Sequence, residues 1–150
     1  MKTEEIENVI VLSNLAIEKK AMDLNVIDLR EMEYVTDFFI IATGFNEVHI
    51  QAIADHILRL TKGTIYKPWH KEGITPGSTW VCLDFGDIVF HIMSKEKRNY
   101  YNLESLWHDA PQIDILPIIA GMEKGKIPLS LSVSSEEPEK GVASPDKEND

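Results

Sequence analysis

Five histidines and a few paired carboxylates are the side chains of this 150-residue chain that could take part in chemistry. His49 and His56 are seven residues apart, which puts both on one side of a helix. No His-Glu-x-x-His or Cys-x-x-Cys pattern accompanies them, and the nearest carboxylate in that segment, Asp55, faces another direction. We therefore interpret both histidines as solvated side chains and expect no metal site.

Asp84 and Asp87 enclose the triplet Asp-Phe-Gly that protein kinases also contain. No glycine-rich loop, strand lysine or His-Arg-Asp motif goes with it, so the match is a coincidence. Two carboxylates could hold Mg²⁺, but one on a strand and one at a turn make a poor cage. Gly44-Phe45-Asn46 could receive a phosphate at a helix start, yet a single glycine favours a plain capped helix. We expect no catalytic residue and no cofactor.

The stretch that carries these aspartates, residues 80–93, predicts a β-hairpin. Gly86-Asp87 is typical of a two-residue type II′ turn, since the first position needs a positive φ. Phe85 then lies opposite Ile88, and alternation assigns each residue to a face. One face is entirely apolar and is the predicted core face: Val81, Leu83, Phe85, Ile88, Phe90 and Ile92.

The other face of this hairpin is mixed in character. It carries Trp80, Cys82, Asp84, Val89, His91 and Met93. Two interpretations stay open. A helix could cover this face and make Trp80 a core residue, or the face could bind a protein. An exposed tryptophan flanked by carboxylates suits a basic partner.

The elements around the hairpin follow from periodicity and capping residues. Helices are predicted over 3–20 with Thr3 as cap, over 46–62 with Asn46 as cap, and over 95–107. Their buried stripes include Ile50, Ile53, Ile57 and Leu60, and Tyr100, Leu103 and Trp107. Strands are predicted over 25–29, 37–43, 64–69 and the two hairpin arms, with 70–79 as loop. The order α-β-β-α-β-β-β-α predicts an α/β (α+β mixed) fold, a mixed sheet of about five strands flanked by helices.

Composition limits the function classes. The chain is 43% hydrophobic and has a formal net charge of −10, which argues against DNA or RNA as the main partner and permits a basic protein. A single cysteine, Cys82, gives no disulfide framework. No apolar run is long enough for a membrane span, and the first helix starts too early for a leader, so we expect a soluble cytoplasmic protein without membrane attachment.

Domain organisation changes after residue 114. The pattern predicts a domain over 1–114, an extension over 115–133 packing on or near it, and a disordered acidic tail over 134–150. The tail contains six acidic side chains and two lysines.

Several motifs together resemble the ribosomal silencing factor (RsfS, or Iojap) family. They are Trp80-Val-Cys-Leu-Asp84-Phe-Gly-Asp87-Ile-Val-Phe-His91-Ile-Met, Tyr101-Asn-Leu-Glu104-Ser-Leu-Trp107 before Asp109-Ala-Pro111, Asp37-Phe-Phe-Ile-Ile-Ala-Thr-Gly44 before Ala52-Ile-Ala-Asp55, and Glu72-Gly73. The similarity covers about residues 5–114. His108 departs from it, since a glycine is expected there, and residues 115–150 lie outside it.

The resemblance implies a function by binding. Family members bind the large ribosomal subunit on the universal ribosomal protein numbered fourteen, at the subunit-joining face. They block docking of the small subunit and repress translation when nutrients are short. Trp80 would then be the aromatic anchor, surrounded by His70, Glu72, Asp84, Phe85, Asp87 and His91. A homodimer through the same face would compete with the ribosome.

The alternative is a nucleotidyltransferase-like enzyme or nucleotide-binding protein, because the family fold is similar to that class. That reaction needs a Gly-Ser motif followed by an Asp-x-Asp pair to hold metal ions. Here Phe45 follows Gly44 and the next strand holds no such pair.

Overall fold

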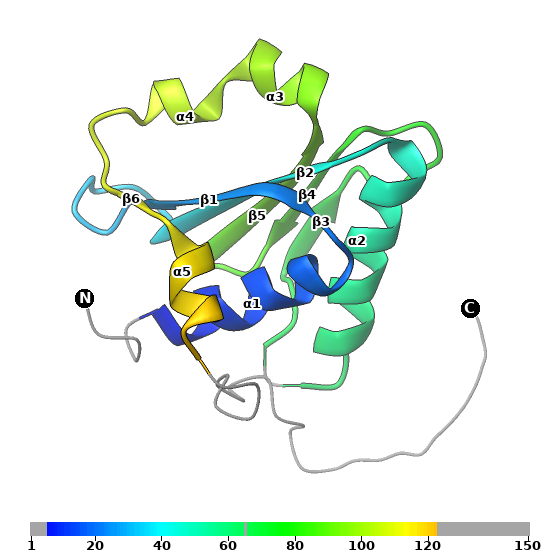
Figure 1. The fold of residues 1–150 in the computed structure, drawn as a ribbon, viewed down its shortest axis with the longest axis horizontal. Coiled ribbons are helices and arrows are strands. Elements are labelled where there is room, and N and C mark those ends of the chain that lie inside the picture. Colours follow the sequence, from blue (N-terminus) through cyan, green and yellow to red (C-terminus); the bar gives the residue numbers. More distant parts are fainter. Residues whose placement is uncertain (1–5, 65, 123–150) are drawn as a thin grey trace.

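A computed structural model of the chain describes residues 6–64 and 66–122 (Figure 1). Its helices are α1 (Glu7–Glu18), α2 (Glu47–Thr61), α3 (Lys95–Tyr101), α4 (Leu103–Leu106) and α5 (Ile115–Ala120). Its strands are β1 (Met22–Asp28), β2 (Phe38–Gly44), β3 (His70–Glu72), β4 (Trp80–Asp84), β5 (Ile88–Ser94) and β6 (Gln112–Ile113). The predicted α/β fold is confirmed, and the elements follow the predicted order α-β-β-α-β-β-β-α up to α3, after which α4, β6 and α5 are added. The mixed sheet has six strands in the order β3-β4-β5-β2-β1-β6.

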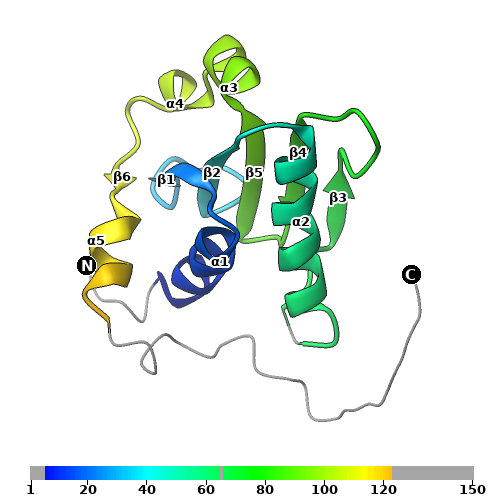
Figure 2. The same ribbon diagram turned by 45° about the vertical axis from the view of Figure 1, so that its right-hand side comes forward.

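Strand β2 lies in the middle of the sheet and every one of its residues is buried. It pairs in parallel with β5 and antiparallel with β1. Helices α1, α2 and α5 cover one face of the sheet, and α3 with α4 lies over the other (Figures 1 and 2). A strand covered on both faces is apolar throughout, as the sequence 38–42 predicts.

The hairpin has the predicted register. Val81 pairs with Ile92 and Leu83 with Phe90, and the Phe85 amide donates to the Ile88 carbonyl at 2.8 Å. Gly86 at the turn has φ +94°, which is the reason for a glycine there. All six residues of the predicted core face are buried in the larger apolar cluster, under α1 and α2.

Helix α2 begins where predicted, since the Asn46 side chain accepts from the His49 amide at 2.9 Å. The predicted buried stripe is correct for Ile50, Ile53 and Ile57 but wrong for Leu60, which is exposed. Thr61, one residue further on, is fully buried instead, because it lies closer than Leu60 to the direction of Ile50 around the helix axis. Helix α2 is seen along its length in Figure 2.

The strand predicted over 64–69 is wrong, because the third strand is β3, within the predicted loop. The Thr64 hydroxyl bonds locally to the Thr61 and Tyr66 carbonyls, and Pro68 has no amide hydrogen to pair. β3 is a wholly exposed edge strand of polar residues, so it has no apolar alternation that would reveal it.

The single helix predicted over 95–107 is also wrong. Asn102 has a left-handed backbone (φ 48°) and ends α3, while its side chain caps α4 by accepting from the Ser105 amide at 3.2 Å. Asparagine tolerates this conformation better than most residues, so it can end one helix and start the next. Tyr100 is exposed and belongs to no buried stripe, whereas Leu103 and Trp107 pack on the sheet.

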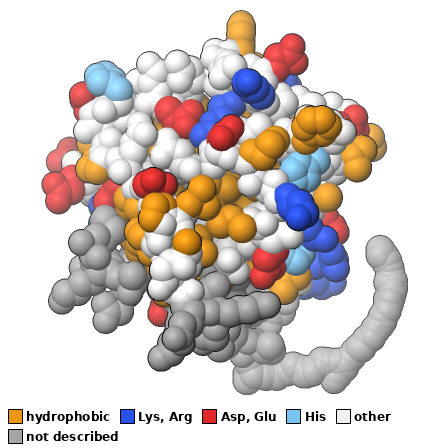
Figure 3. All heavy atoms as spheres, viewed as in Figure 1, with side chains coloured by type: hydrophobic (Ala, Val, Ile, Leu, Met, Phe, Trp, Pro, Cys, Tyr) orange, Lys and Arg blue, Asp and Glu red, His pale blue; other side chains and the backbone are white. Residues whose placement is uncertain are grey.

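After residue 111 the chain forms β6 beside β1, and α5 packs against α1 and β1 with Ile115 fully buried. Figure 3 shows hydrophobic side chains gathered around α5 in this view, among scattered charges of both signs. The Thr3 cap, the end of the predicted extension and the predicted acidic tail lie outside the described residues. Within the described part of the chain, no helix has the length and apolarity needed to cross a membrane.

Candidate functional site

The sheet face under α3 and α4 is only partly covered. α3 packs against β5 and β2, and a second apolar cluster beneath the two helices contains Ile27, Leu29, Phe39, Ile41, Met93 and Ala110. Toward the β3 edge this cover stops. His70 and Glu72 are exposed, and Trp80, Cys82 and Asp84 are half-buried. The mixed face of the hairpin is therefore partly core and partly surface.

Trp80 lies at the boundary between these two parts. Its indole Nε1 donates to His91 Nδ1 at 3.1 Å, and its ring lies 4.8 Å from the ring of Tyr101 at the end of α3. Tyr101 is 51% exposed. The two rings form a fixed, partly accessible aromatic pair, which is the arrangement that binding anchors have in protein interfaces.

His91 supports this pair from inside the sheet. His91 is 7% exposed, and burial lowers the pKa of its imidazole to about 4, so the imidazole is neutral at pH 7. Because Nδ1 accepts from Trp80, the proton lies on Nε2, for which the described residues provide no hydrogen-bond partner. His91 also meets the Phe39 ring edge-on at 4.8 Å. It orients the indole and offers little surface of its own.

Two of the predicted carboxylates, Asp84 and Asp87, flank the hairpin turn and have different hydrogen-bond partners. Asp84 accepts from the Gly86 amide at 2.8 Å, and Asp87 accepts from the Tyr66 hydroxyl at 2.8 Å. Burial raises the pKa of the Tyr66 hydroxyl, and the neighbouring Asp87 carboxylate raises it further. Tyr66 therefore stays a donor at neutral pH.

Phe85 is the predicted site residue that the fold removes from the surface. It is 3% exposed and stacks on Tyr66 with 5.0 Å between ring centroids. His70 and Glu72, by contrast, lie on the outer strand β3 with 2.9 Å between imidazole and carboxylate. Of the seven predicted residues, the strand register brings His70, Glu72, Trp80 and Asp84 to one face of the sheet, with the buried His91 beside Trp80. Asp87 does not join them, because it lies at the turn tip and bonds to Tyr66, which packs with Phe85 on the opposite face.

Trp69 is a surface aromatic that the sequence prediction missed. It directly precedes β3, its amide donates to the Asp84 carbonyl at 2.7 Å, and it is 82% exposed. Its ring lies against Gly86, because a Cβ built there would be 3.0 Å from it. The only sequence signal was its position one residue before His70.

The histidine pair of α2 is not solvated as predicted. His49 accepts from the Phe45 amide at 2.8 Å through Nδ1 and contacts the Lys19 carbonyl at 2.7 Å through Nε2. His56 contacts the Glu18 carboxylate at 2.8 Å. Both histidines therefore fasten α2 to the end of α1. Across the described residues, no three histidine, cysteine or acidic side chains come together as a metal site.

Comparisons with known proteins give one consistent result. The family model described as "Ribosomal silencing factor during starvation" (RsfS) matches residues 2–146. The chain is 34% identical over 107 residues to a ribosomal silencing factor RsfS of Halalkalibacterium halodurans, covering 71% of this chain and 91% of that protein. It is 37% identical over 98 residues to the RsfS of Bacillus subtilis, covering 65% and 82%.

A solved crystal structure from Bacillus halodurans has a similar fold, with a TM-score of 0.63 and 31% sequence identity. The match covers 72% of this chain and 97% of that chain.

Proposed function

Because the chain belongs to the RsfS family of ribosomal silencing factors, we propose that it binds the subunit-joining face of the large ribosomal subunit and there blocks docking of the small subunit. The chain is a ribosome-binding factor and not an enzyme, as its family is. The enzymatic form of the alternative, a nucleotidyltransferase, is therefore wrong. Translation is repressed in this way when nutrients are limited.

Obstruction of this kind needs occupancy and no chemical step. A bound protein excludes the small subunit from the volume that it fills, so the extent of repression follows the fraction of large subunits occupied. What the chain must supply is affinity and correct placement on its ribosomal partner. Both depend on one accessible surface with a few strong contacts.

The observation that carries the proposal is the half-buried indole of Trp80, held by His91 and Tyr101 beside an acidic rim. We assign the partner surface to Trp80 and Tyr101 at its centre. The rim contains Trp69, His70, Glu72 and Asp84, whereas Asp87 lies outside it at the turn tip. An acidic rim around aromatic anchors fits a basic protein surface, and we propose the universal ribosomal protein numbered fourteen as that partner. Phe85 contributes only to the core.

Replacing Trp80 by alanine tests this assignment. The substitution removes the anchor, and we expect affinity for large subunits to fall by on the order of 2 kcal/mol, which is about thirtyfold. Co-sedimentation of the purified protein with large subunits measures it. Phe45→Ala serves as a control, since Phe45 is an exposed aromatic residue at the start of α2. A folded Trp80→Ala protein that binds as well as the wild type would remove Trp80 from the site.

The sequence leaves the oligomeric state open, and a homodimer through the same surface is the alternative use of this face. If two copies pair through Trp80 and Tyr101, ribosome binding and self-association exclude each other. Sedimentation equilibrium of the wild type and of Trp80→Ala measures this. A dimer that persists unchanged in the variant would place the self-association elsewhere.

A further inference from the structure

Helices α3 and α4 have a weak apolar attachment to the rest of the molecule. Neither contains a buried residue, and only the half-buried Leu103 and Trp107 join the apolar cluster beneath them. A helix pair of seven and four residues, joined at a left-handed asparagine, has little stability of its own. Polar contacts must therefore fix where the pair lies.

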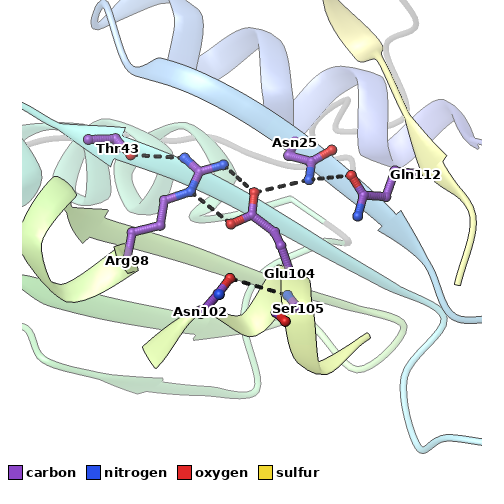
Figure 4. A network of polar contacts seen from close by, with 7 residues as sticks. All are labelled: Asn25, Thr43, Arg98, Asn102, Glu104, Ser105 and Gln112. Atoms are coloured by element: carbon purple, nitrogen blue, oxygen red, sulfur yellow. Dashed lines mark hydrogen bonds and ion pairs between the residues drawn. The ribbon is translucent and has the colours of Figure 1, made fainter. Parts of the chain in front are cut away.

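One connected polar network supplies those contacts (Figure 4). The Arg98 guanidinium of α3 donates to both oxygens of Glu104 in α4, at 3.2 Å from Nε and 2.6 Å from Nη2. Its Nη1 donates to the Thr43 hydroxyl of β2 at 2.9 Å. The fork thus ties the two helices to each other and to the central strand.

The carboxylate of Glu104 extends the network across the sheet. It accepts from Asn25 Nδ2 of β1 at 3.0 Å, and the same amide donates to Gln112 of β6 at 3.1 Å. The network therefore joins α3, α4, β1, β2 and β6, which are separated by up to 87 residues in the chain.

The Arg98–Glu104 ion pair is largely shielded from solvent, so its stability depends on well-formed hydrogen bonds. The side chains of Arg98 and Glu104 are 12% and 25% exposed. The Arg98 hydrogen bonds hold the pKa of the Glu104 carboxyl below its usual value although burial opposes them, and Asn25 assists. A shielded guanidinium that loses its carboxylate is left as an uncompensated charge, and a lysine cannot reproduce the fork.

The Arg98–Glu104 ion pair spans the bend between α3 and α4. Arg98 and Glu104 lie on either side of Tyr101 and Asn102, so their fork closes the bend at which α3 ends. Tyr101, the last residue of α3, contacts Trp80 from this bend.

We propose that Arg98 is a positioning residue for the partner surface. With Glu104 it holds the bend, and the bend keeps the Tyr101 ring against Trp80 before the large subunit arrives. The inference rests on the proposed function. Ordering these side chains in advance reduces the entropy lost on binding.

A double-mutant cycle on the full chain tests the inference. We expect Arg98→Met to weaken binding to large subunits about tenfold by itself, and less than twofold in a Tyr101→Ala background. An effect that passes through Tyr101 disappears when Tyr101 is absent, whereas a general structural effect remains. Arg59→Met is the matched control, because Arg59 forms an exposed ion pair with Asp55 on α2, and it should leave binding unchanged.

The outcomes separate the inference from the function beneath it. Equal losses from Arg98→Met in both backgrounds, or no loss in either, would overturn the positioning role. If Arg98→Met does not fold by circular dichroism, Glu104→Gln replaces it in the same cycle, since it keeps the side-chain shape and removes the charge. Trp80→Ala is measured in parallel: unchanged binding there overturns the proposed surface itself, while a loss there with an unaffected Arg98→Met overturns only the inference.

Discussion

At the scale of single residues, the hydrogen bond between Trp80 and His91 couples a surface to a buried titratable group. The indole N–H needs an acceptor, and only a neutral imidazole offers one at Nδ1. Burial keeps the imidazole neutral by lowering its pKa to about 4. A histidine at this position therefore makes the fold sensitive to acid.

The free energy of unfolding should show this sensitivity between pH 7 and pH 5. The unfolded chain protonates His91 near pH 6.5 while the folded chain does not until about pH 4, so stability is lost as pH falls through this interval. The expected loss from His91 is about 2 kcal/mol by pH 5. His91→Asn keeps an acceptor oxygen near the Nδ1 position and does not titrate. Between pH 7 and pH 5 its urea midpoint should therefore fall less than that of the wild type.

Two lowered carboxyl pKa values do not interfere with that measurement. Asp28 is paired with Arg30 and Glu104 with Arg98, and both pKa values lie below the ordinary 3.8 and 4.5. Their stabilising contributions are complete above those values and disappear only at lower pH. If the urea midpoint falls equally between pH 7 and pH 5 in His91→Asn and in the wild type, the assignment of the imidazole as neutral is contradicted.

At the scale of elements, the hairpin turn also positions the surface aromatic before β3. Gly86 and Gly77 both have positive φ, at +94° and +88°. They differ in surroundings, since a Cβ on Gly86 would meet the Trp69 ring at 3.0 Å and one on Gly77 meets nothing within 4 Å. The two glycines thus form a matched pair for separating backbone strain from ring displacement.

Gly86→Ala and Gly77→Ala should each lose about 1 kcal/mol of stability, because an alanine at positive φ is strained. Only Gly86→Ala should also move Trp69 and change the tryptophan emission spectrum. The spectral change should be absent when Gly86→Ala is combined with Trp69→Phe. Identical spectra for Gly86→Ala and the wild type would show that the ring does not depend on the turn.

At the scale of the whole molecule, the sheet separates the proposed partner surface from the opposite edge. β3, with His70 and Glu72, is one edge strand and β6 is the other, with Asp114 directly after it. The chain as a whole carries a net charge of −10, so overall charge alone cannot direct a basic partner to one edge. Local placement of the carboxylates has to do so.

Charge reversals at the two edges test that separation. Glu72→Lys and Asp114→Lys change the net charge equally, but we expect only Glu72→Lys to slow association with large subunits, by about fivefold at low salt. The difference should shrink as salt screens the charges. Stopped-flow association at several ionic strengths measures it. Equal effects at both edges would mean that net charge, and not the rim, governs association.

The sequence by itself determined the parts of the fold that depend on local pattern. Alternation and the Gly86-Asp87 turn specify the hairpin register, the apolar run of 38–42 specifies a central strand, and Asn46 specifies the start of α2. Each of these features is specified by residues within a few positions of one another, because backbone sterics and side-chain periodicity act over that range. The family was recognisable for the same reason, since its motifs are short and contiguous.

Only the tertiary structure decided which residues form the surface. The exposure of Trp69, the support of Trp80 by His91, and the contact of Tyr101 with Trp80 depend on segments that meet only in the folded sheet. The break at Asn102 is stabilised by a network that reaches from β1 to β6. Edge strand β3 lacks an apolar face, so no periodicity reveals it. Long-range contacts have no local pattern, and this is why the binding surface required the fold.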